Sequence, residues 1–306
     1  MPAVAGDSKK AIVAALIANG GIAIAKFVGF AITGAASLLA EAVHSVADTS
    51  NQALLLLGGR RAKLKASELH PFGYGRERYF WAFCVALVLF SMGGLFAIYE
   101  GIEKLRHPHG VEDLMVAVGI LVVAILLETF SLMTAIREAK KTKGDASWWQ
   151  FIRHSRNPEL PVVLLEDIGA EVGLFLALAG VVMGHVTEEP RWDAAGSLGI
   201  GILLVVIAIT LVIEMKSLLI GESASTADLD RIKGAIEGTA NVDRVIHMRT
   251  QHLGPDELLV AAKLAMTPTL TFPQVAETIN AAESALRAAV PAARVVYLEP
   301  DSPRPT

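Results

Sequence analysis

Two short patterns in the sequence place metal-binding side chains on one face of a helix. His44 and Asp48 are four residues apart, and Asp167 and Glu171 repeat that spacing with two carboxylates. Residues four apart lie on the same helical face, with Cβ atoms about 5–6 Å apart. One imidazole and three carboxylates suit a divalent transition metal, and a tetrahedral arrangement suits Zn²⁺. Two such helices packed face to face are therefore predicted to form a divalent metal site.

Both patterns lie inside long apolar stretches, where an ionisable group costs at least about 2.5–3.5 kcal/mol at a membrane-helix centre. Glu41, Glu128 and Glu166 are further acids in such stretches. Ion pairing does not account for all of them, because Lys26 is the fixed cation among these stretches and its long side chain can snorkel to the membrane surface. We therefore expect the acids to mark a cation pathway rather than structural polar packing.

The composition is that of a membrane protein with one modest soluble segment. Of 306 residues, 53% are apolar and 19% are charged, with a mean hydropathy of +0.49. Soluble domains are typically about one quarter charged. The net charge of −4 and pI near 6.1 exclude a nucleic-acid binder, and the single Cys84 excludes an internal disulfide or a CxxC metal site.

Six apolar stretches are long enough to span a bilayer, which takes about 20 residues. They lie near 10–32, 35–58, 79–102, 113–136, 161–185 and 195–219. Gly34 separates the first two stretches and predicts a tight turn. After Gly221 charged residues become frequent and the segments shorten. The sequence therefore predicts an all-α membrane domain of six transmembrane helices at 1–221 and a cytoplasmic C-terminal domain at 222–306.

Basic residues in the links predict the orientation of these helices. The links after the second and fourth stretches hold twelve Lys and Arg residues, whereas those after the third and fifth hold three. Cytoplasmic loops carry the excess of positive charge, so both termini are expected in the cytoplasm. No targeting segment is evident, and the helices are rich in Ala and Gly. These features fit a multi-pass protein of the cell (inner) membrane.

The C-terminal segment predicts a small α/β domain. Helical patterns cover 228–238 and 276–289, and strand patterns cover 244–249, 258–264 and 294–298. The order αββαβ suits a layer of helices on one face of a three-stranded sheet. The segment 222–306 is too short to form a large enzyme domain.

Four segments together resemble the cation diffusion facilitator family of proton-coupled zinc transporters. They are 37–52 (SLLAEAVHSVADTSNQ), 70–76 (HPFGYGR), 99–102 (YEGI) and 249–255 (RTQHLGP). The resemblance implies a homodimer whose protomers each have six membrane helices and a ferredoxin-like cytoplasmic dimerisation and regulatory domain. It also implies export of a divalent cation from the cytoplasm in exchange for protons by alternating access. His44 and Asp48 correspond to the family's second-helix ligands.

The fifth membrane helix departs from the family pattern, HxxxD or DxxxD. Aligning the family aspartate with Asp167 puts Val163 at the other ligand position, and valine cannot bind metal. Glu171 shares a helical face with Asp167 and is the favoured fourth ligand, while Glu166 is rotated by about 100° and is the second choice. The Leu-Glu-Asp pattern at 165–167 is similar to a variant subgroup close to mitochondrial or nuclear-associated zinc transporters.

Several functional alternatives stay open at the level of sequence. Zn²⁺ is the expected cargo, with Mn²⁺ or Fe²⁺ as alternatives because the shell is rich in oxygen. A non-transporting metal sensor or scaffold is one rival, and a membrane-embedded metalloenzyme is another, although no HExxH pattern is present. We expect no enzyme activity and no cofactor. The expected partners are the metal ion, protons, the lipid bilayer and a second copy of the chain, without nucleic acid.

Overall fold

The computed structural model describes residues 20–301. The chain divides into two compact units. The first holds the chain up to Gly58 together with Phe80–Met215, and the second holds Gly59–Tyr79 together with the chain from Lys216 onward. The link Gly59–Tyr79 belongs to the second unit, although it lies within the range 1–221 predicted for the membrane domain. The domain boundary at 221/222 stays a prediction.

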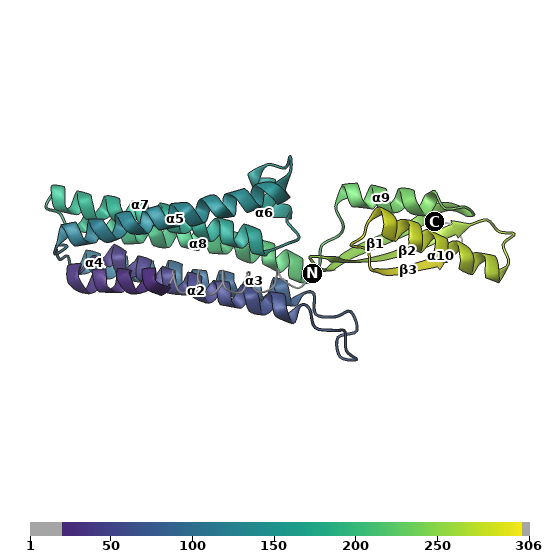
Figure 1. Cartoon of the computed structure of the whole chain (residues 1–306), viewed down its shortest axis with the longest axis horizontal. Helices are drawn as coiled ribbons and strands as arrows, with labels where there is room; N and C mark the ends of the chain where they lie inside the picture. Colours follow the sequence, from purple (N-terminus) through teal and green to yellow (C-terminus); the bar gives the residue numbers. More distant parts are fainter. Residues whose placement is uncertain (1–19, 302–306) are drawn as a thin grey trace, which may run out of the picture. The chain divides into compact units, whose positions relative to one another are not determined.

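The first unit is built of helices that run along a common direction (Figure 1). Within the described residues, a helix covers Gly20–Thr33. The others are α2 (Ala36–Arg61), α3 (Glu77–Val88), the π-helix η1 (Leu89–Leu95), α4 (Phe96–Arg106), α5 (Leu114–Lys143), α6 (Trp148–His154), α7 (Glu159–Val186) and α8 (Arg191–Ile220). The helices α3, η1 and α4 form one continuous segment, and α5 packs against α7.

Within residues 20–301, three helical segments are long and apolar enough to cross a membrane: Glu77–Arg106, Leu114–Lys143 and Arg191–Ile220. They confirm a multi-pass membrane protein by length and composition. The helices α2 and α7 have 26 and 28 residues and carry the acids of the predicted site. The first predicted stretch, 10–32, lies partly outside the described residues. The count of six transmembrane helices therefore stays a prediction.

The start of α2 is fixed by a buried carboxylate of α8. Gly34 makes the predicted tight turn, with φ of +64°, a left-handed conformation that favours glycine. Asp193 accepts hydrogen bonds from the backbone N–H groups of Ala36, at 2.8 Å, and Ser37, at 3.3 Å. Lys104 of α4 lies 3.6 Å from the same carboxylate. A negative charge at a helix N-terminus is favourable, so Asp193 positions the helix that carries His44 and Asp48.

The second unit contains the predicted small α/β fold. Its elements are α9 (Thr226–Glu237), β1 (Val242–Gly254), β2 (Glu257–Met266), α10 (Phe272–Ala289) and β3 (Val295–Pro300). The sheet order is β1-β2-β3, with β1 antiparallel and β3 parallel to β2. This αββαβ arrangement confirms the expected ferredoxin-like class, and the strands are longer than the sequence predicted.

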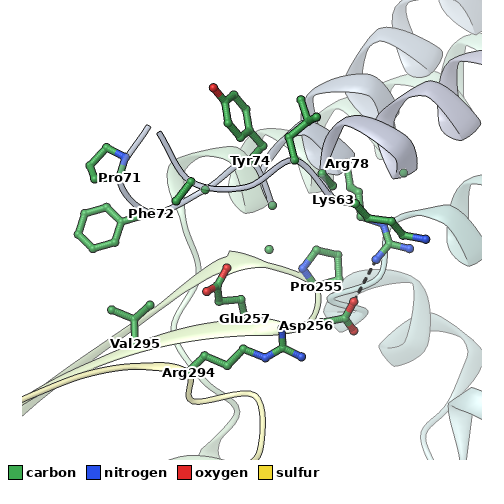
Figure 2. A pocket seen from close by; sticks show the side chains of 17 residues that line it. Lys63, Pro71, Phe72, Tyr74, Arg78, Pro255, Asp256, Glu257, Arg294 and Val295 are labelled. Carbon is green, nitrogen blue, oxygen red and sulfur yellow. Dashed lines mark hydrogen bonds and ion pairs between the residues drawn. The ribbon is translucent and has the colours of Figure 1, made fainter. Parts of the chain in front are cut away.

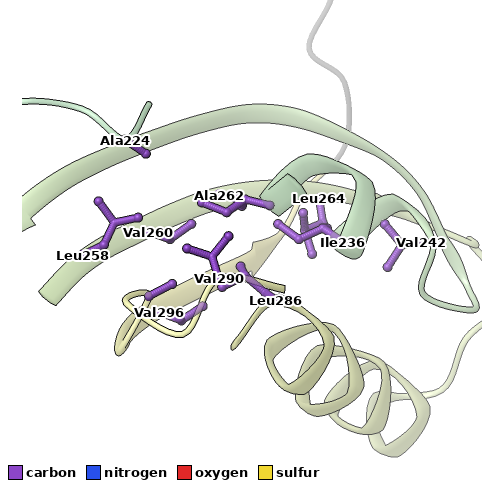
Figure 3. Close-up of a cluster of buried hydrophobic side chains, with 12 residues drawn as sticks. Ala224, Ile236, Val242, Leu258, Val260, Ala262, Leu264, Leu286, Val290 and Val296 are labelled. Atoms are coloured by element: carbon purple, nitrogen blue, oxygen red, sulfur yellow. The ribbon is translucent and has the colours of Figure 1, made fainter. Parts of the chain in front are cut away.

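Alternation along β2 explains why both helices cover one face of this sheet. Every second residue of the strand is buried: Leu258, Val260, Ala262 and Leu264. These side chains share one core with residues of α9 and α10, including Ile232, Ile236 and Leu286. Figure 3 shows this core between the strands and α10. Burial of these apolar side chains stabilises the unit by about 1.5–3 kcal/mol for each large residue.

Candidate functional site

A small cavity inside the helical unit is lined by side chains with oxygen donors. Its volume is about 30 Å³. Such a volume has room for about one or two water-sized species. The lining residues are Ile22, Ser45, Asp48, Gln52, Glu128, Ser131 and Asp167. The carboxylates come from three helices, α2, α5 and α7, so the fold brings acids distant in sequence to one place.

Helical register explains which side chains reach this cavity. Ser45, Asp48 and Gln52 are three and four residues apart on α2, and Glu128 and Ser131 are three apart on α5. Residues with these spacings lie on one helical face. Each of these two helices therefore presents a short row of polar side chains to the cavity, and its apolar side chains lie on its other faces.

His44 contacts Asp48 but does not line the cavity. Its Nε2 lies 3.4 Å from Oδ2 of Asp48, and the imidazole is fully buried. Neither ring nitrogen has a hydrogen-bond partner within residues 20–301. A Cβ atom at Gly93 would lie 3.6 Å from His44 Nδ1, which places the ring beside η1. Short π-helical segments inside α-helices are frequent at functional sites.

The acids of α7 face two different helices. The hydroxyl of Ser131 donates to Asp167 at 3.1 Å, and the hydroxyl of Thr129 donates to Glu171 at 2.8 Å, so both acids contact α5. Glu166 instead accepts a hydrogen bond of 2.6 Å from the Asn51 side chain of α2. Glu166 is only 5% exposed.

The structure brings together part of the predicted ligand set. His44 contacts Asp48, and Asp48 shares the cavity with Asp167, whereas Glu171 and Glu166 lie outside the cavity lining. Within the described part of the chain, no group of three or more His, Cys, Asp or Glu residues is close enough to hold a metal ion. The four-ligand assignment therefore stays a prediction.

Two features of this region differ from the sequence expectation. Lys26 does not snorkel: it is 2% exposed and forms an ion pair of 3.0 Å with Glu41, because α2 offers a carboxylate at its depth. One buried acid is therefore charge-paired. Glu128 was recognised as an acid within a span but not as a lining residue of the site. Glu128 lies three residues before Ser131, and this spacing indicates that the two side chains share one face of α5.

A row of incompletely bonded polar atoms runs along one face of α2. Glu41 Oε1, both His44 nitrogens, Asp48 Oδ1 and Asn51 Oδ1 are buried and have no hydrogen-bond partner within residues 20–301. These positions are separated by three or four residues and therefore share a helical face. Buried polar groups are normally bonded, and exceptions often belong to sites that bind an ion or water. This face of α2 is the strongest candidate for a cation pathway.

The second unit contains a larger cavity of about 460 Å³. It lies between the link Gly59–Tyr79 and the turn that joins β1 to β2. Figure 2 shows Arg78 of the link and Asp256 of the turn, which form an ion pair of 3.3 Å. Lys63, Arg294 and Glu257 add charges of both signs, so the lining favours no single class of ligand.

The membrane part of the chain matches a known family. The profile described as "Cation efflux transmembrane domain" matches residues 12–220. This range includes every residue of the candidate pathway on α2, α5 and α7.

Individual relatives extend this likeness. The chain is 32% identical over 248 residues to "Proton-coupled zinc antiporter SLC30A9, mitochondrial" of Mus musculus, covering 80% of this chain and 44% of that protein. It is 25% identical over 301 residues to "Cation-efflux pump FieF" of Salmonella schwarzengrund, covering 98% and 94%. A solved structure of the MamM C-terminal domain, in a cadmium form, is 22% identical over 26% of this chain and 98% of its own, with a TM-score of 0.25. The chain spans less than half the length of the mouse protein.

Proposed function

Because this chain belongs to the cation efflux family, we propose that it exports a divalent metal ion from the cytoplasm in exchange for protons. The observation that carries the proposal is the buried polar face of α2 beside a cavity lined by carboxylates of three helices. Zn²⁺ is the first choice of cargo, and the name of the mouse relative supports both zinc and proton coupling. Mn²⁺ and Fe²⁺ are the alternatives for an oxygen-rich shell.

The proposed ligands are His44, Asp48, Asp167 and one glutamate of α7. Metal binding to imidazole and carboxylate groups requires their deprotonated forms, so binding releases protons. When the site opens to the other side of the membrane, protons compete for the same lone pairs and help release the metal. An imidazole suits this role because its neutral form binds a metal ion and its protonated form does not.

Helical geometry and observed contacts favour different residues as the fourth ligand. Glu171 shares the face of Asp167, four residues along α7. Glu166 contacts Asn51 of α2, the helix that carries His44 and Asp48, and this contact supports the second choice. Substitution of each acid by glutamine keeps its size, removes its charge and separates the two assignments.

The remaining parts of the proposal concern assembly and location. We propose a homodimer in the cell (inner) membrane with both termini in the cytoplasm. The basic links after the second and fourth predicted stretches support this orientation. The C-terminal segment 222–306 is proposed as the cytoplasmic dimerisation and regulatory domain.

Metal flux in proteoliposomes tests the function. The purified chain is reconstituted, and uptake of Zn²⁺, Mn²⁺, Fe²⁺, Co²⁺ and Cd²⁺ is compared with uptake into protein-free vesicles. Saturable uptake, highest for Zn²⁺, supports the proposal. Metal binding without flux of any ion overturns it in favour of a sensor. Metal-dependent hydrolysis without flux overturns it in favour of a metalloenzyme.

A further inference from the structure

A buried lysine connects the first helix to the wall of the cavity. Lys26, in Gly20–Thr33, donates to Glu41 Oε2 at 3.0 Å and to Ser45 Oγ at 2.8 Å. Both partners lie on α2, four residues apart, and all three side chains are buried. The ammonium group therefore bridges two positions on the helix that carries His44 and Asp48.

The ion pair is enclosed where three helices meet. Lys26 and Glu41 expose 2% and 1% of their side chains. Glu41 Oε1 lies against α7, because a Cβ atom at Gly173 would be 2.5 Å from it. The absence of a side chain at Gly173 thus makes room for the carboxylate. Loss of one partner in such a pair leaves a buried charge without compensation.

Both partners of Lys26 adjoin the candidate site. Ser45 lines the cavity together with Asp48 and Asp167. Glu41 precedes His44 by three residues and belongs to the same row of incompletely bonded atoms on α2. The charge carried by Lys26 and Glu41 therefore acts directly beside the groups proposed to bind metal.

We propose that Lys26 is a positioning residue that neutralises Glu41 and holds Ser45, so that Glu41 does not act as an additional metal ligand. The inference rests on the proposed transport function. In this account, the negative charge that attracts the metal comes from the carboxylates that line the cavity, Asp48, Glu128 and Asp167, and not from Glu41. The ion pair is then a device that sets how tightly the site holds a divalent cation and how readily it releases that cation.

Single substitutions at this pair are expected to change zinc affinity in opposite directions. In Lys26→Met, Glu41 is an additional carboxylate beside the site, so KM for Zn²⁺ falls about tenfold and the maximal rate falls because release is slower. In Glu41→Gln, the unpaired ammonium repels the metal, so KM rises about tenfold. Such changes are the size expected for one unit charge near a partly buried site.

The double variant Lys26→Met/Glu41→Gln separates charge balance from simple structural damage. Both charges are absent, so KM and the maximal rate return to within about threefold of wild type. Lys263→Met is the matched control, because it removes the same charge from an ion pair of 2.8 Å with Asp301 in the second unit. This variant is expected to leave KM unchanged.

The experiment measures zinc uptake by proteoliposomes and, in parallel, zinc binding by the detergent-purified chain. Opposite shifts in the single variants and restoration in the double variant support the proposal. Shifts in the same direction, or a double variant no closer to wild type than the worse single variant, overturn it. If Lys26→Met does not fold, Glu41→Gln is compared with the double variant, which must restore KM. If wild type binds zinc without transporting it, the proposed function fails and the binding constants still decide the inference.

Discussion

The two units of this chain bury different kinds of residue. Among the described residues, the buried polar side chains of the helical unit include Lys26, Glu41, His44 and Glu166, several with incompletely bonded atoms. The αββαβ fold of the second unit instead buries a nearly continuous apolar core. Buried charge is costly, whereas buried apolar surface is the main source of stability. The comparison teaches that the polar interior of the first unit lowers its free energy of unfolding. A cation pathway requires such an interior, because the cation needs polar groups to bind.

Removal of the polar groups on α2 should have the largest effect. His44→Ala and Asp48→Ala are expected to reduce zinc uptake by proteoliposomes at least a hundredfold, because each removes a proposed ligand. Folding should persist, because the costly buried groups are removed rather than added. Glu283→Gln, at a partly exposed position of α10 in the second unit, is a matched acid control that should retain wild-type uptake. Wild-type uptake by either α2 variant would refute the assignment of the site.

The apolar core of the second unit should respond in the opposite way. Leu286 is fully buried in α10, and Leu286→Ala is expected to destabilise this unit by about 2–5 kcal/mol. Hydrogen exchange of β2 in the detergent-solubilised full chain measures the change. Zinc binding by the helical unit should be retained under conditions where the protein is folded. Loss of zinc binding with normal protection of β2 would contradict the proposed division of roles.

The fourth ligand is expected to show an intermediate effect. Glu166→Gln and Glu171→Gln are compared. The variant that removes the fourth ligand should weaken zinc binding about tenfold to a hundredfold, and the other variant should change zinc binding by less than about threefold. Zinc affinity differs between the two variants because only one of them loses a charged ligand. Isothermal calorimetry with the purified chain measures both variants. Equal effects would show that neither acid is the single missing ligand.

A helix cap in the second unit should give the smallest effect. Thr271 and Gln274 form a capping box at the start of α10. Thr271→Ala is expected to lower the stability of this unit by about 1 kcal/mol, because a bonded N–H group loses its partner. Thr271→Ser keeps the hydroxyl and is the matched control. Hydrogen exchange of α10 measures both, and equal destabilisation by Ala and Ser would show that the cap does not contribute.

Local sequence patterns predicted the second unit well. The strand pattern at 258–264 predicted the middle of β2, and the helical pattern at 276–289 predicted α10, which begins four residues earlier, at Phe272. The alternation of buried residues along β2 and the capping box at Thr271 are local features of the same kind. Caps and alternation act between residues close in the chain, so one sequence is enough to read them. The strands are longer than predicted because their ends pair with neighbouring strands. Local sequence patterns carry no information about this pairing.

The helical unit was predictable in outline but not in its contacts. Apolar runs predicted the long helices, three of which are long and apolar enough to span a membrane within residues 20–301, and the spacing of His44 and Asp48 predicted one polar face. The ion pair of Lys26 with Glu41, the place of Glu128 in the cavity and the contact of Glu166 with Asn51 depend on how separate helices are rotated against each other. The π-helix η1 was also missed, because no local residue pattern distinguished it from the flanking α-helices.

Coupled zinc and proton movement tests the central claim most directly. Proteoliposomes with an internal pH-sensitive dye receive a zinc gradient, and zinc uptake and proton efflux are recorded together. The proposed exchange predicts that zinc entry raises the internal pH in wild-type vesicles and that Asp48→Asn abolishes both signals. Zinc entry without proton movement, or equal signals from wild type and Asp48→Asn, would contradict it.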